Sequence, residues 1–580
     1  MKHFYALLLL TLVAASGTCA QEPPPPGEKQ HDVFKVAAFG AKGDGRNDDG
    51  PAIQKALDAA IAAGIGAEVV LDAGKIYRLG SNTADLAVLR IGSACGLTLA
   101  GNRATLVAHP SNRLLCIFDS SNVVIRDLVL DYSPLPFTQA RLTEVALTEG
   151  FLRFRVELGY DDPSVGGTDI YRDFKSSDAV FLDGATRAFT HDWGRIASIK
   201  ALGEHYFEAR FHNKDMQNRF AKVKTGDFIA IKQHFSEAPS QRDQHGRYLS
   251  STSPNIYITF SQNVRLERII SHASPGMTFV ATGSEGVVLD GCQVVRKPNT
   301  DRLIASNSDG AHFKSLTVMP LVQNSIFEAL MDDSINIKIS SELVKEVLGT
   351  RVRLAHGDIA TDDLVIRPGQ SLLFLGGAAK RHLGYAKILA VERIRYREAW
   401  ITLETTIPGL AVGDLAFLRP TTDAVVTRCE FRTQLKTALV THPPTVISEC
   451  VFTDVAYGVH SPFNSNIEGP PPQGMRVNQC RFVHPSVAAI ALHLPSLATG
   501  TPGRQALVAD HCQFTVGDNR GVVLNAYNQD GIILRNAQVS IADNRTKADL
   551  IRLHNCINVV EEKVAFTTSQ KPTTLPQGDK

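Results

Sequence analysis

The chain has 580 residues, of which 44% are hydrophobic and 21% are charged, with 60 Lys and Arg against 59 Asp and Glu. This ordinary globular composition excludes disorder, collagen and coiled coil as descriptions of the whole chain. The formal net charge of +1 gives no electrostatic case for binding nucleic acid or an anionic membrane surface. The 44 Gly and 28 Pro indicate many turns and favour a β-rich fold.

The first residues have the pattern of a secretory signal peptide. Lys2 precedes an apolar run over 4–15, and small residues follow up to Ala20. The run is shorter than the roughly 20 apolar residues that span a bilayer, and no later stretch is long enough either. We therefore expect a signal peptide over 1–20, a proline-rich linker over 21–33, and an exported protein in the periplasm or the medium.

The next predicted element is an amphipathic helix. Asp48 and Asp49 are placed to cap it, Pro51 suits its first turn, and Gly64 is placed to end it. Its apolar residues recur at helical spacing on one stripe: Ile53, Ala56, Leu57, Ala60 and Ile61. We expect this helix to cover the open end of the repeated structure that follows, because an exposed strand edge invites aggregation.

A short phrase then recurs along the chain: a small residue, any residue, and Phe or Val. Where the coils look uninterrupted, successive copies lie between 21 residues (Cys429 to Cys450) and 33 residues (Cys292 to Ser325) apart, and each follows an alternating apolar run. Alternating strands at this spacing predict a β-solenoid, whose coils bury their apolar faces by stacking. Cysteine at the same phase predicts a ladder of small buried side chains, with disulfides between coils as the alternative. The copies are Cys292-Gln-Val294, Ser325-Ile-Phe327, Cys429-Glu-Phe431, Cys450-Val-Phe452, Cys480-Arg-Phe482 and Cys512-Gln-Phe514.

Two stretches interrupt this repeat, at about 140–235 and 343–420. Both contain strands that look antiparallel, and both close on a similar phrase, Gly226-Asp-Phe-Ile-Ala-Ile and Gly413-Asp-Leu-Ala-Phe-Leu. The shared phrase predicts two related small antiparallel β-barrels inserted into solenoid turns, with two unrelated long loops as the alternative. The fold class we expect is all-β: a parallel β-helix with an N-terminal capping helix and two inserted barrels. Its solenoid parts are 34–139, 236–342 (which carries the catalytic coils) and 421–565, with a tail over 566–580.

The densest acidic cluster lies between residues 305 and 338. Asp309 and the pair Asp332 and Asp333 are about one coil apart in sequence, and adjacent strands lie about 4.8 Å apart. We therefore expect the three carboxylates side by side on one face, where mutual repulsion raises the pKa of at least one of them. A protonated acid beside an ionised base is what glycosidic hydrolysis requires. The alternative is structural, because Asp-Asp and Asp-Gly pairs are common in turns.

Other side chains around the cluster are candidates for binding a sugar. His272 falls about one coil before Asp309, although a structural histidine is the alternative there. Phe137 follows a proline-rich exit from a coil, where its ring can stack on a sugar face. No spacing matches a zinc or EF-hand signature, so we expect no metal. The remaining candidates flank the acidic cluster: Asn307, His312, Asn336 and Lys338.

Several segments resemble known families. The phrase that runs from Ala38 to Gln54 resembles the opening of pectate-lyase-like right-handed β-helix proteins, which indicates a fold and not a reaction. Asp131-Tyr-Ser-Pro-Leu-Pro-Phe-Thr-Gln, Asn307-Ser-Asp-Gly-Ala-His-Phe and Met331-Asp-Asp-Ser-Ile-Asn, together with two inserted barrels, are similar to glycoside hydrolase family 110. The likeness covers most of the chain after residue 33.

This resemblance implies an exo-acting α-1,3-galactosidase with an inverting mechanism. It implies that Asp309, Asp332 and Asp333 are the catalytic residues and that neither a metal nor an organic cofactor takes part. The chain departs from the family pattern after Asn336, where Ile337-Lys-Ile-Ser follows in place of the expected His and Gly. The departure bears on the substrate more than on the reaction class.

Three functions are compatible with the sequence. The first is an exo-glycosidase, with Asp332 or Asp333 as acid or base and Asp309 opposite. The one-coil offset favours the separation of about 6.5–9.5 Å typical of inverting enzymes, with about 5–5.5 Å and a retaining mechanism as the alternative. The second is a polysaccharide lyase or uronate epimerase, which needs a cation, and Lys338 is the only cation near the cluster in sequence. The third is a non-catalytic carbohydrate-binding solenoid. The expected partner is a carbohydrate with terminal α-galactosides, without nucleic acid or a membrane span, and a homodimer is left open.

Overall fold

The computed structural model describes most of the chain after residue 31. The expected signal peptide and most of the linker lie outside the described residues. Within them, no helix combines the length and apolar character needed to cross a membrane. The description covers residues 32–568 except for 81–86, 112, 164–177, 213–219, 234–253, 357–363, 378–380, 396, 463–467, 496–504 and 518–519.

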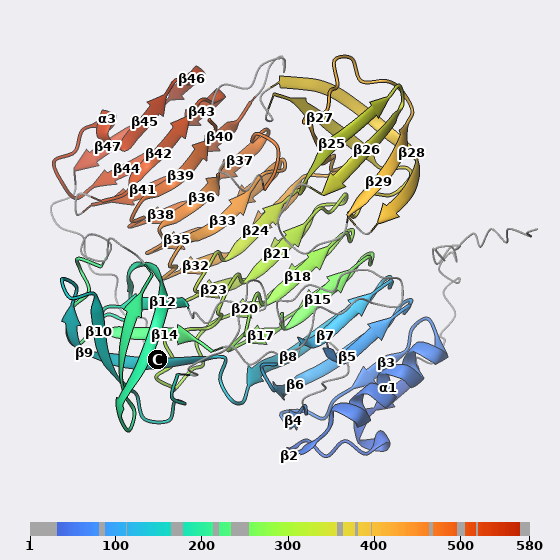
Figure 1. Ribbon diagram of the computed structural model, residues 1–580, viewed down its shortest axis with the longest axis vertical. Helices are drawn as coiled ribbons and strands as arrows, with labels where there is room; N and C mark the ends of the chain where they lie inside the picture. Colours follow the sequence, from blue (N-terminus) through green and yellow to red (C-terminus); the bar gives the residue numbers. More distant parts are fainter. Residues whose placement is uncertain are drawn as a thin grey trace, which may run out of the picture.

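The predicted helix, α1 (Gly50–Ala63), lies at the N-terminal end of the molecule (Figure 1). Its apolar stripe is buried against the first coil, and Gly64 ends it with a positive φ of 92°. Asp49 occupies the N-cap position without capping through its side chain. Its carboxylate instead accepts hydrogen bonds from the backbone N–H of Lys42 (2.7 Å) and Gly43 (3.1 Å), so it holds the loop before the helix. Asp48 accepts from the N–H of Gly50 at 3.0 Å.

Behind α1, parallel strands stack along the whole molecule as a solenoid (Figure 1). One face is an 11-stranded sheet, and the other faces join in a 24-stranded sheet. The 11-stranded sheet contains β5 (Ala87–Gly92), β7 (Arg113–Phe118), β15 (Ile256–Thr259), β18 (Phe279–Thr282), β21 (Ala311–Lys314), β24 (Ile335–Lys338), β33 (Thr437–Thr441), β36 (Tyr457–Ser461), β39 (Ala488–His493), β42 (Val522–Tyr527) and β45 (Ile551–His554).

The 24-stranded sheet supplies the remaining walls of the coils. Two short helices, η1 (Val36–Phe39) and α3 (Lys547–Leu550), lie at the two ends of the chain. The strands are β1 (Val33–Lys35), β2 (Asp44–Asp48), β3 (Glu68–Val70), β4 (Ile76–Arg78), β6 (Thr98–Ala108), β8 (Val124–Tyr132), β16 (Arg265–Glu267), β17 (Ile270–Ser271), β19 (Val288–Asp290), β20 (Gln293–Val294), β22 (Leu321–Gln323), β23 (Ile326–Glu328), β31 (Ala424–Thr427), β32 (Glu430–Arg432), β34 (Thr445–Ser448), β35 (Val451–Thr453), β37 (Met475–Asn478), β38 (Arg481–Val483), β40 (Leu507–Asp510), β41 (Gln513–Val516), β43 (Asp530–Arg535), β44 (Gln538–Ile541), β46 (Ile557–Glu562) and β47 (Ala565–Thr568).

The repeated phrase forms two ladders inside the solenoid. The Phe side chains stack ring on ring, with centroids 4.8 Å apart from Phe431 to Phe452 and 4.6 Å apart from Phe452 to Phe482. The cysteines of the phrase are buried free thiols, which confirms the ladder over the disulfide alternative at Cys292, Cys429, Cys450, Cys480 and Cys512. Side chains at the same phase therefore stack coil upon coil and form the core of this wall.

The two interruptions are closed antiparallel barrels beside the solenoid (Figure 1). Together with the solenoid and α1, these two barrels confirm the predicted fold class, a β-helix with an N-terminal helix and inserted barrels. The first contains β9 (Phe137–Ala146), β10 (Phe151–Val156), β11 (Asp178–Leu182), β12 (Phe189–Gly203), β13 (Tyr206–Phe211) and β14 (Phe228–Lys232). The second contains β25 (Ser341–Leu348), β26 (Arg351–His356), β27 (Ser371–Gly376), β28 (Arg381–Arg395), β29 (Glu398–Leu403) and β30 (Leu415–Leu418).

The phrase that closes both barrels makes the same corner in each. Asp227 accepts hydrogen bonds from the N–H of Lys224 (3.0 Å) and of Gly184 (3.0 Å). Asp414 accepts in the same way from Ala411 (2.8 Å), also three residues earlier, and from a glycine of another strand end at 3.3 Å. The glycine before each aspartate has a φ of +93°. The repeated phrase therefore reports a shared local structure, which supports two related barrels.

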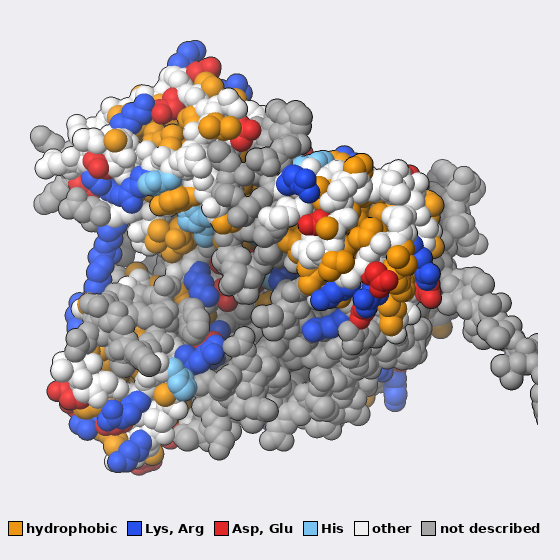
Figure 2. All heavy atoms as spheres, turned by 45° about the horizontal axis from the view of Figure 1, so that its top comes forward, with side chains coloured by type: hydrophobic (Ala, Val, Ile, Leu, Met, Phe, Trp, Pro, Cys, Tyr) orange, Lys and Arg blue, Asp and Glu red, His pale blue; other side chains and the backbone are white. Residues whose placement is uncertain are grey.

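The second barrel leaves the stacking of the solenoid uninterrupted. The strands before it pair directly in parallel with those after it: β22 with β31, β23 with β32 and β24 with β33. On the face seen in Figure 2, basic and acidic side chains of the described residues are interspersed, in agreement with the formal net charge of +1.

Candidate active site

The acidic residues lie at the start of neighbouring strands of the 11-stranded sheet. Ala311 of β21 pairs with Ile335 of β24, which pairs with Leu439 of β33. Counting back two residues along each strand places Asp309, Asp333 and Thr437 in one row. Counting back three places Asp332 beside Lys436. The solenoid therefore brings these side chains together although more than 100 residues separate Asp332 from Lys436 in the sequence.

The three carboxylates form one compact group. One oxygen from each of Asp309, Asp332 and Asp333 lies within 4.8 Å of the others. This spacing is shorter than the 6.5–9.5 Å or so expected from the one-coil offset, because Asp309 and Asp333 are in register and not staggered. Oxygens at this distance are close enough for one water molecule to donate a hydrogen bond to two of them. They also match the hard oxygen ligands of Mg²⁺ or Ca²⁺, although the Lys436 ammonium already supplies a positive charge here.

Asp309 is the most buried of the three, with 3% of its surface exposed. Its Oδ2 lies 2.7 Å from Nδ1 of His312, which is the first outward-facing residue of β21. Burial raises the pKa of Asp309 well above its usual range, and the negative charge of Asp332 raises it further. Asp309 therefore favours the protonated form more than an ordinary aspartate does.

Asp332 behaves in the opposite way. Its Oδ1 accepts a hydrogen bond from Nζ of Lys436 at 3.1 Å, and both side chains are 30% exposed. Burial on its own would raise the pKa of Asp332, but the ammonium groups of Lys436 and then Lys232 outweigh it, and the pKa lies below its usual range. Asp332 is therefore the carboxylate of the group that ionises first.

Asp333 resembles Asp309 in its protonation. Its Oδ1 accepts a hydrogen bond from the backbone N–H of Thr437 at 3.2 Å. Burial raises its pKa well above the usual range, and the charges of Asp332 and Asp309 add to the effect. The site thus combines one ionised carboxylate with two that favour the protonated form, which is the acid and base complement needed for glycosidic hydrolysis.

Two amides next to the carboxylates have acceptors without partners. Nδ2 of Asn307 donates to the Pro136 carbonyl at 2.6 Å, while its Oδ1 is buried and makes no hydrogen bond. Oδ1 of Asn336, beside His312 on the same sheet face, is also buried and without a partner. Buried acceptors are normally hydrogen-bonded in proteins, so these two oxygens are suited to accept hydrogen bonds from sugar hydroxyls.

Several known proteins are similar in sequence to this chain. No family model matches the chain. Its relatives include α-1,3-galactosidase A of Bacteroides fragilis, 22% identical over 365 residues that cover 61% of this chain and 57% of that protein. They also include α-1,3-galactosidase B of Akkermansia muciniphila (22% over 327 residues, 54% and 38%) and of Bacteroides thetaiotaomicron (23% over 452 residues, 72% and 69%).

These α-1,3-galactosidases are homologues of the chain. Their similarity supports the resemblance to glycoside hydrolase family 110 that the motifs indicated, and it supports a glycoside hydrolase. The matched region spans 57% and 38% of the lengths of the first two galactosidases. Among solved structures, the chain is similar to family 28 exopolygalacturonase of Yersinia enterocolitica (TM-score 0.42, 13% identity, covering 94% of this chain and 79% of that one). The exopolygalacturonase of Thermotoga maritima gives a TM-score of 0.40 at 12% identity, covering 93% of each chain.

Two residues predicted to contact sugar lie elsewhere in this galactosidase homologue. Phe137 begins β9 with its ring in the core, 1% exposed, so it offers no face to a sugar and the stacking prediction is wrong. Nδ1 of His272 bonds to the Val295 carbonyl at 3.1 Å. His272 also lies beside the buried ion pair in which Arg302 binds Asp131 at 2.7 Å, and burial lowers its pKa. These contacts give it a structural role.

Three charged residues lie at the site that were not among the residues predicted from the sequence. Lys436 contacts Asp332 directly, which corrects the expectation that Lys338 is the only cation near the cluster. The repeat offered the signal: Lys436 follows Phe431 by five residues, as Asp332 follows Phe327, and the two Phe are in register. Lys232 reaches the site from the first barrel, and no local sequence pattern predicts its position near Asp332.

Glu468 is the third, and it contributes a further negative charge. It raises the pKa of Asp309 and Asp333, after burial and their neighbouring aspartates. Its Oε1 lies 4.0 Å from Nζ of Lys338, which is 8% exposed at the end of β24. Lys338 is thereby placed between the acidic group and the loop that carries Glu468.

Proposed function

We propose that the protein is an exo-acting glycoside hydrolase that removes terminal α-1,3-linked galactose from oligosaccharides or glycoconjugates. The observation that carries the proposal is the group of three carboxylates within 4.8 Å, in which one pKa is lowered and two are raised. The homologues named α-1,3-galactosidase support the choice of sugar and linkage.

The proposed reaction divides the work between the two kinds of carboxylate. Asp332, held ionised by Lys436, accepts a proton from the attacking water, whose oxygen bonds to the anomeric carbon. Asp309 or Asp333 donates its proton to the glycosidic oxygen as the bond to the leaving group breaks. Inversion is proposed on the resemblance to glycoside hydrolase family 110, since the 4.8 Å spacing of the nearest carboxylate oxygens is closer to the roughly 5–5.5 Å of retaining enzymes. Water attack opposite the leaving group inverts the anomeric centre, so the first product is β-galactose. Asn307 and Asn336 accept hydrogen bonds from hydroxyls of the bound sugar.

A proton NMR time course tests the class, the linkage and the stereochemistry together. The substrate is a trisaccharide that ends in α-1,3-linked galactose, run beside a branched blood-group B glycan and α-1,4- and α-1,6-linked controls. We expect β-galactose to appear first, from the α-1,3-linked substrates only. Initial release of α-galactose would show that a carboxylate attacks the sugar, and no release from any substrate would reject the proposed function.

The division of roles has its own test, which uses two leaving groups. An activated aryl α-galactoside needs little help from a general acid, whereas a natural disaccharide needs all of it. We expect Asp332→Asn to lose both activities, and either Asp309→Asn or Asp333→Asn to retain the aryl activity selectively. Selective retention by Asp332→Asn would reverse the assignment and make Asp332 the acid.

We also infer export, which brings such an enzyme to its glycans. The support is the charged, apolar and small-residue order of residues 1–20. N-terminal sequencing of the protein from the producing cells should begin after Ala20. A first residue of Met1 in the mature protein would contradict this inference.

A further inference from the structure

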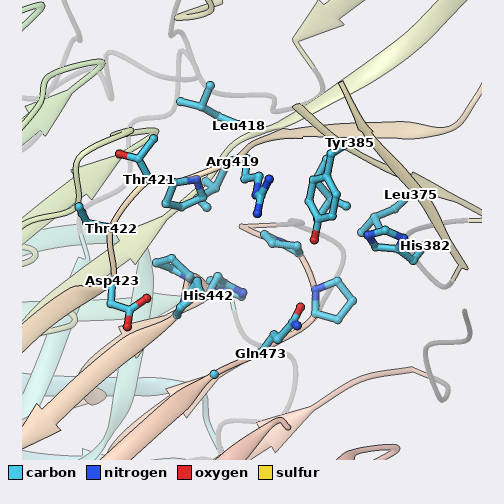
Figure 3. A pocket seen from close by; sticks show the side chains of 18 residues that line it. Leu375, His382, Tyr385, Leu418, Arg419, Thr421, Thr422, Asp423, His442 and Gln473 are labelled. Atoms are coloured by element: carbon cyan, nitrogen blue, oxygen red, sulfur yellow. The ribbon is translucent and has the colours of Figure 1, made fainter. Parts of the chain in front are cut away.

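A second cavity lies where the second barrel meets the solenoid. Its volume is about 360 Å³, and prolines at 443, 444, 470 and 471 form much of its wall. Figure 3 shows Tyr385 and Arg419 from the barrel side, His442 from the end of β33, and Gln473 from the opposite loop, arranged around a common space. A cavity of this size, with apolar walls and a few convergent polar groups, has the character of a ligand site.

His442 is the buried polar group of this cavity. It is 2% exposed, and neither ring nitrogen has a well-formed hydrogen bond, although the Pro470 carbonyl is near. Burial lowers the pKa of His442 to about 3, and the Lys338 ammonium adds to the effect. The ring is therefore neutral at pH 7, and its nitrogen that does not face the Pro470 carbonyl is available to a bound molecule.

Arg419 gives the mouth of the cavity an unbalanced positive charge. Its guanidinium lies over the ring of Tyr385, 4.3 Å from the centroid, and it is exposed. No described carboxylate pairs with it. The acid that lines the same cavity, Asp423, is already bonded to Arg476. A guanidinium held on an aromatic ring is preorganised to bind a carboxylate or sulfate oxygen in its plane.

Two segments of the chain connect the cavity to the acidic group. From Thr437, whose N–H donates to Asp333, the chain follows β33 to His442 just past its end, a path of five residues or about 16 Å. The loop that follows Glu468 supplies Gln473, so one loop faces both places. At physiological ionic strength charges are screened over about 8 Å. The repulsion between an anion in the cavity and the aspartates, about two such lengths away along the strand, is therefore weakened.

We propose that this cavity binds an anionic sugar unit, one that carries a carboxylate or a sulfate ester, in the leaving-group part of the glycan. Arg419 binds the anionic substituent at the mouth of the cavity, and His442 forms a hydrogen bond with a hydroxyl of the same sugar unit inside it. The inference rests on the proposed function, since it takes the three aspartates as the point of cleavage. The protein would then select for charged glycans remote from the galactose it removes.

The test compares matched oligosaccharides with the full-length protein. Tri-, tetra- and pentasaccharides ending in α-1,3-linked galactose are prepared in neutral, sulfated and uronate-containing forms, with the charge on the reducing-end sugar. We expect one charged form to exceed its neutral counterpart about tenfold in kcat/KM at low salt, and the preference to shrink at high salt. The sulfated and uronate forms distinguish the two sources of charge.

The variant Arg419→Gln should abolish this preference and leave the neutral substrates unaffected. The matched control is Arg351→Gln, since Arg351 lies over the ring of Trp400 (4.9 Å) on the same barrel but does not line the cavity. Equal rates for charged and neutral forms, or a preference that survives Arg419→Gln, would overturn the inference.

Binding separates failure of this inference from failure of the proposed function. Calorimetry with the Asp332→Asn protein measures the affinity for the same glycans without turnover. If no glycan is cleaved by the wild type, the proposed function fails. The cavity assignment then stands only if charged forms still bind about tenfold more tightly than neutral ones and lose that advantage in Arg419→Gln.

Discussion

Replacement of Lys436 by Met should move the acidic limb of the pH–rate profile upward. Nζ of Lys436 lies 3.1 Å from Oδ1 of Asp332. Coulomb's law gives about 5 kcal/mol for this separation at an effective dielectric constant of about 20, and about 1 kcal/mol in bulk water. Because both side chains are 30% exposed, the lost electrostatic free energy lies between these limits, and we expect the pKa of Asp332 to rise in the variant.

The sign follows from the role of Asp332 as the base. Asp332 accepts a proton only when it is ionised, so activity is lost as the pH falls through its pKa. A higher pKa in Lys436→Met therefore moves the loss to higher pH, while activity above the new pKa recovers. The assay measures kcat/KM for an α-1,3-linked galactoside at roughly ten pH values between about pH 3 and 8, a range that covers the ionisation of a carboxyl group.

Two further variants make this result decisive. Lys436→Arg keeps the positive charge and should keep the acidic limb close to that of the wild type. Lys55→Met removes an exposed lysine of α1, far from the site in the fold, and should leave the profile unchanged. An acidic limb that stays in place in Lys436→Met, in protein with a wild-type melting temperature, would refute the reasoning.

Three other predictions concern the site and the core. Asn at Asp309, Asp332 or Asp333 should each lower kcat for the natural disaccharide by about 10²–10⁴-fold with unchanged circular dichroism; wild-type rates in all three would remove the carboxylates from the mechanism. EDTA should leave hydrolysis unchanged, because Lys436 already balances charge in the acidic group; loss of activity that Ca²⁺ or Mg²⁺ restores would reveal a metal. Phe452→Ala should lower the free energy of unfolding by about 3–5 kcal/mol in denaturant titrations, since the ring is fully buried between two others; a loss below about 1 kcal/mol would show that the stack relaxes to fill the gap.

The solenoid was predictable because its signal is local and periodic. Cys450 and Phe452 have the same phase as their counterparts in the next coils, and the parallel register then fixes which side chains stack. The same logic placed Asp309 near Asp332 and Asp333. The separation between the carboxylates was overestimated, because the turn before β21 aligns Asp309 with Asp333 and so brings them closer than a staggered pair.

Other features depend on contacts that no local pattern carries. The residue before four of the stacked cysteines has a positive φ of 52° to 54° although it is not glycine, because the corner of the coil imposes it: Arg428, Glu449, Gln479 and His511. Lys232 approaches Asp332 only because the first barrel closes beside the solenoid. The ring of Phe137 was expected in the cleft, but β9 begins there and turns it into the core.

The pairing of β24 with β33 across the second barrel has a consequence for how such proteins diversify. The barrel begins and ends at adjacent coils, so the stack of strands is complete without it, and the entropic cost of a longer connection grows only slowly with its length. The inserted barrel can therefore be lengthened, exchanged or shortened while the stacked strands next to the aspartates keep their register. The proposed leaving-group selectivity, which depends on the second barrel, and bond cleavage, which depends on the solenoid, can then change independently of each other in evolution.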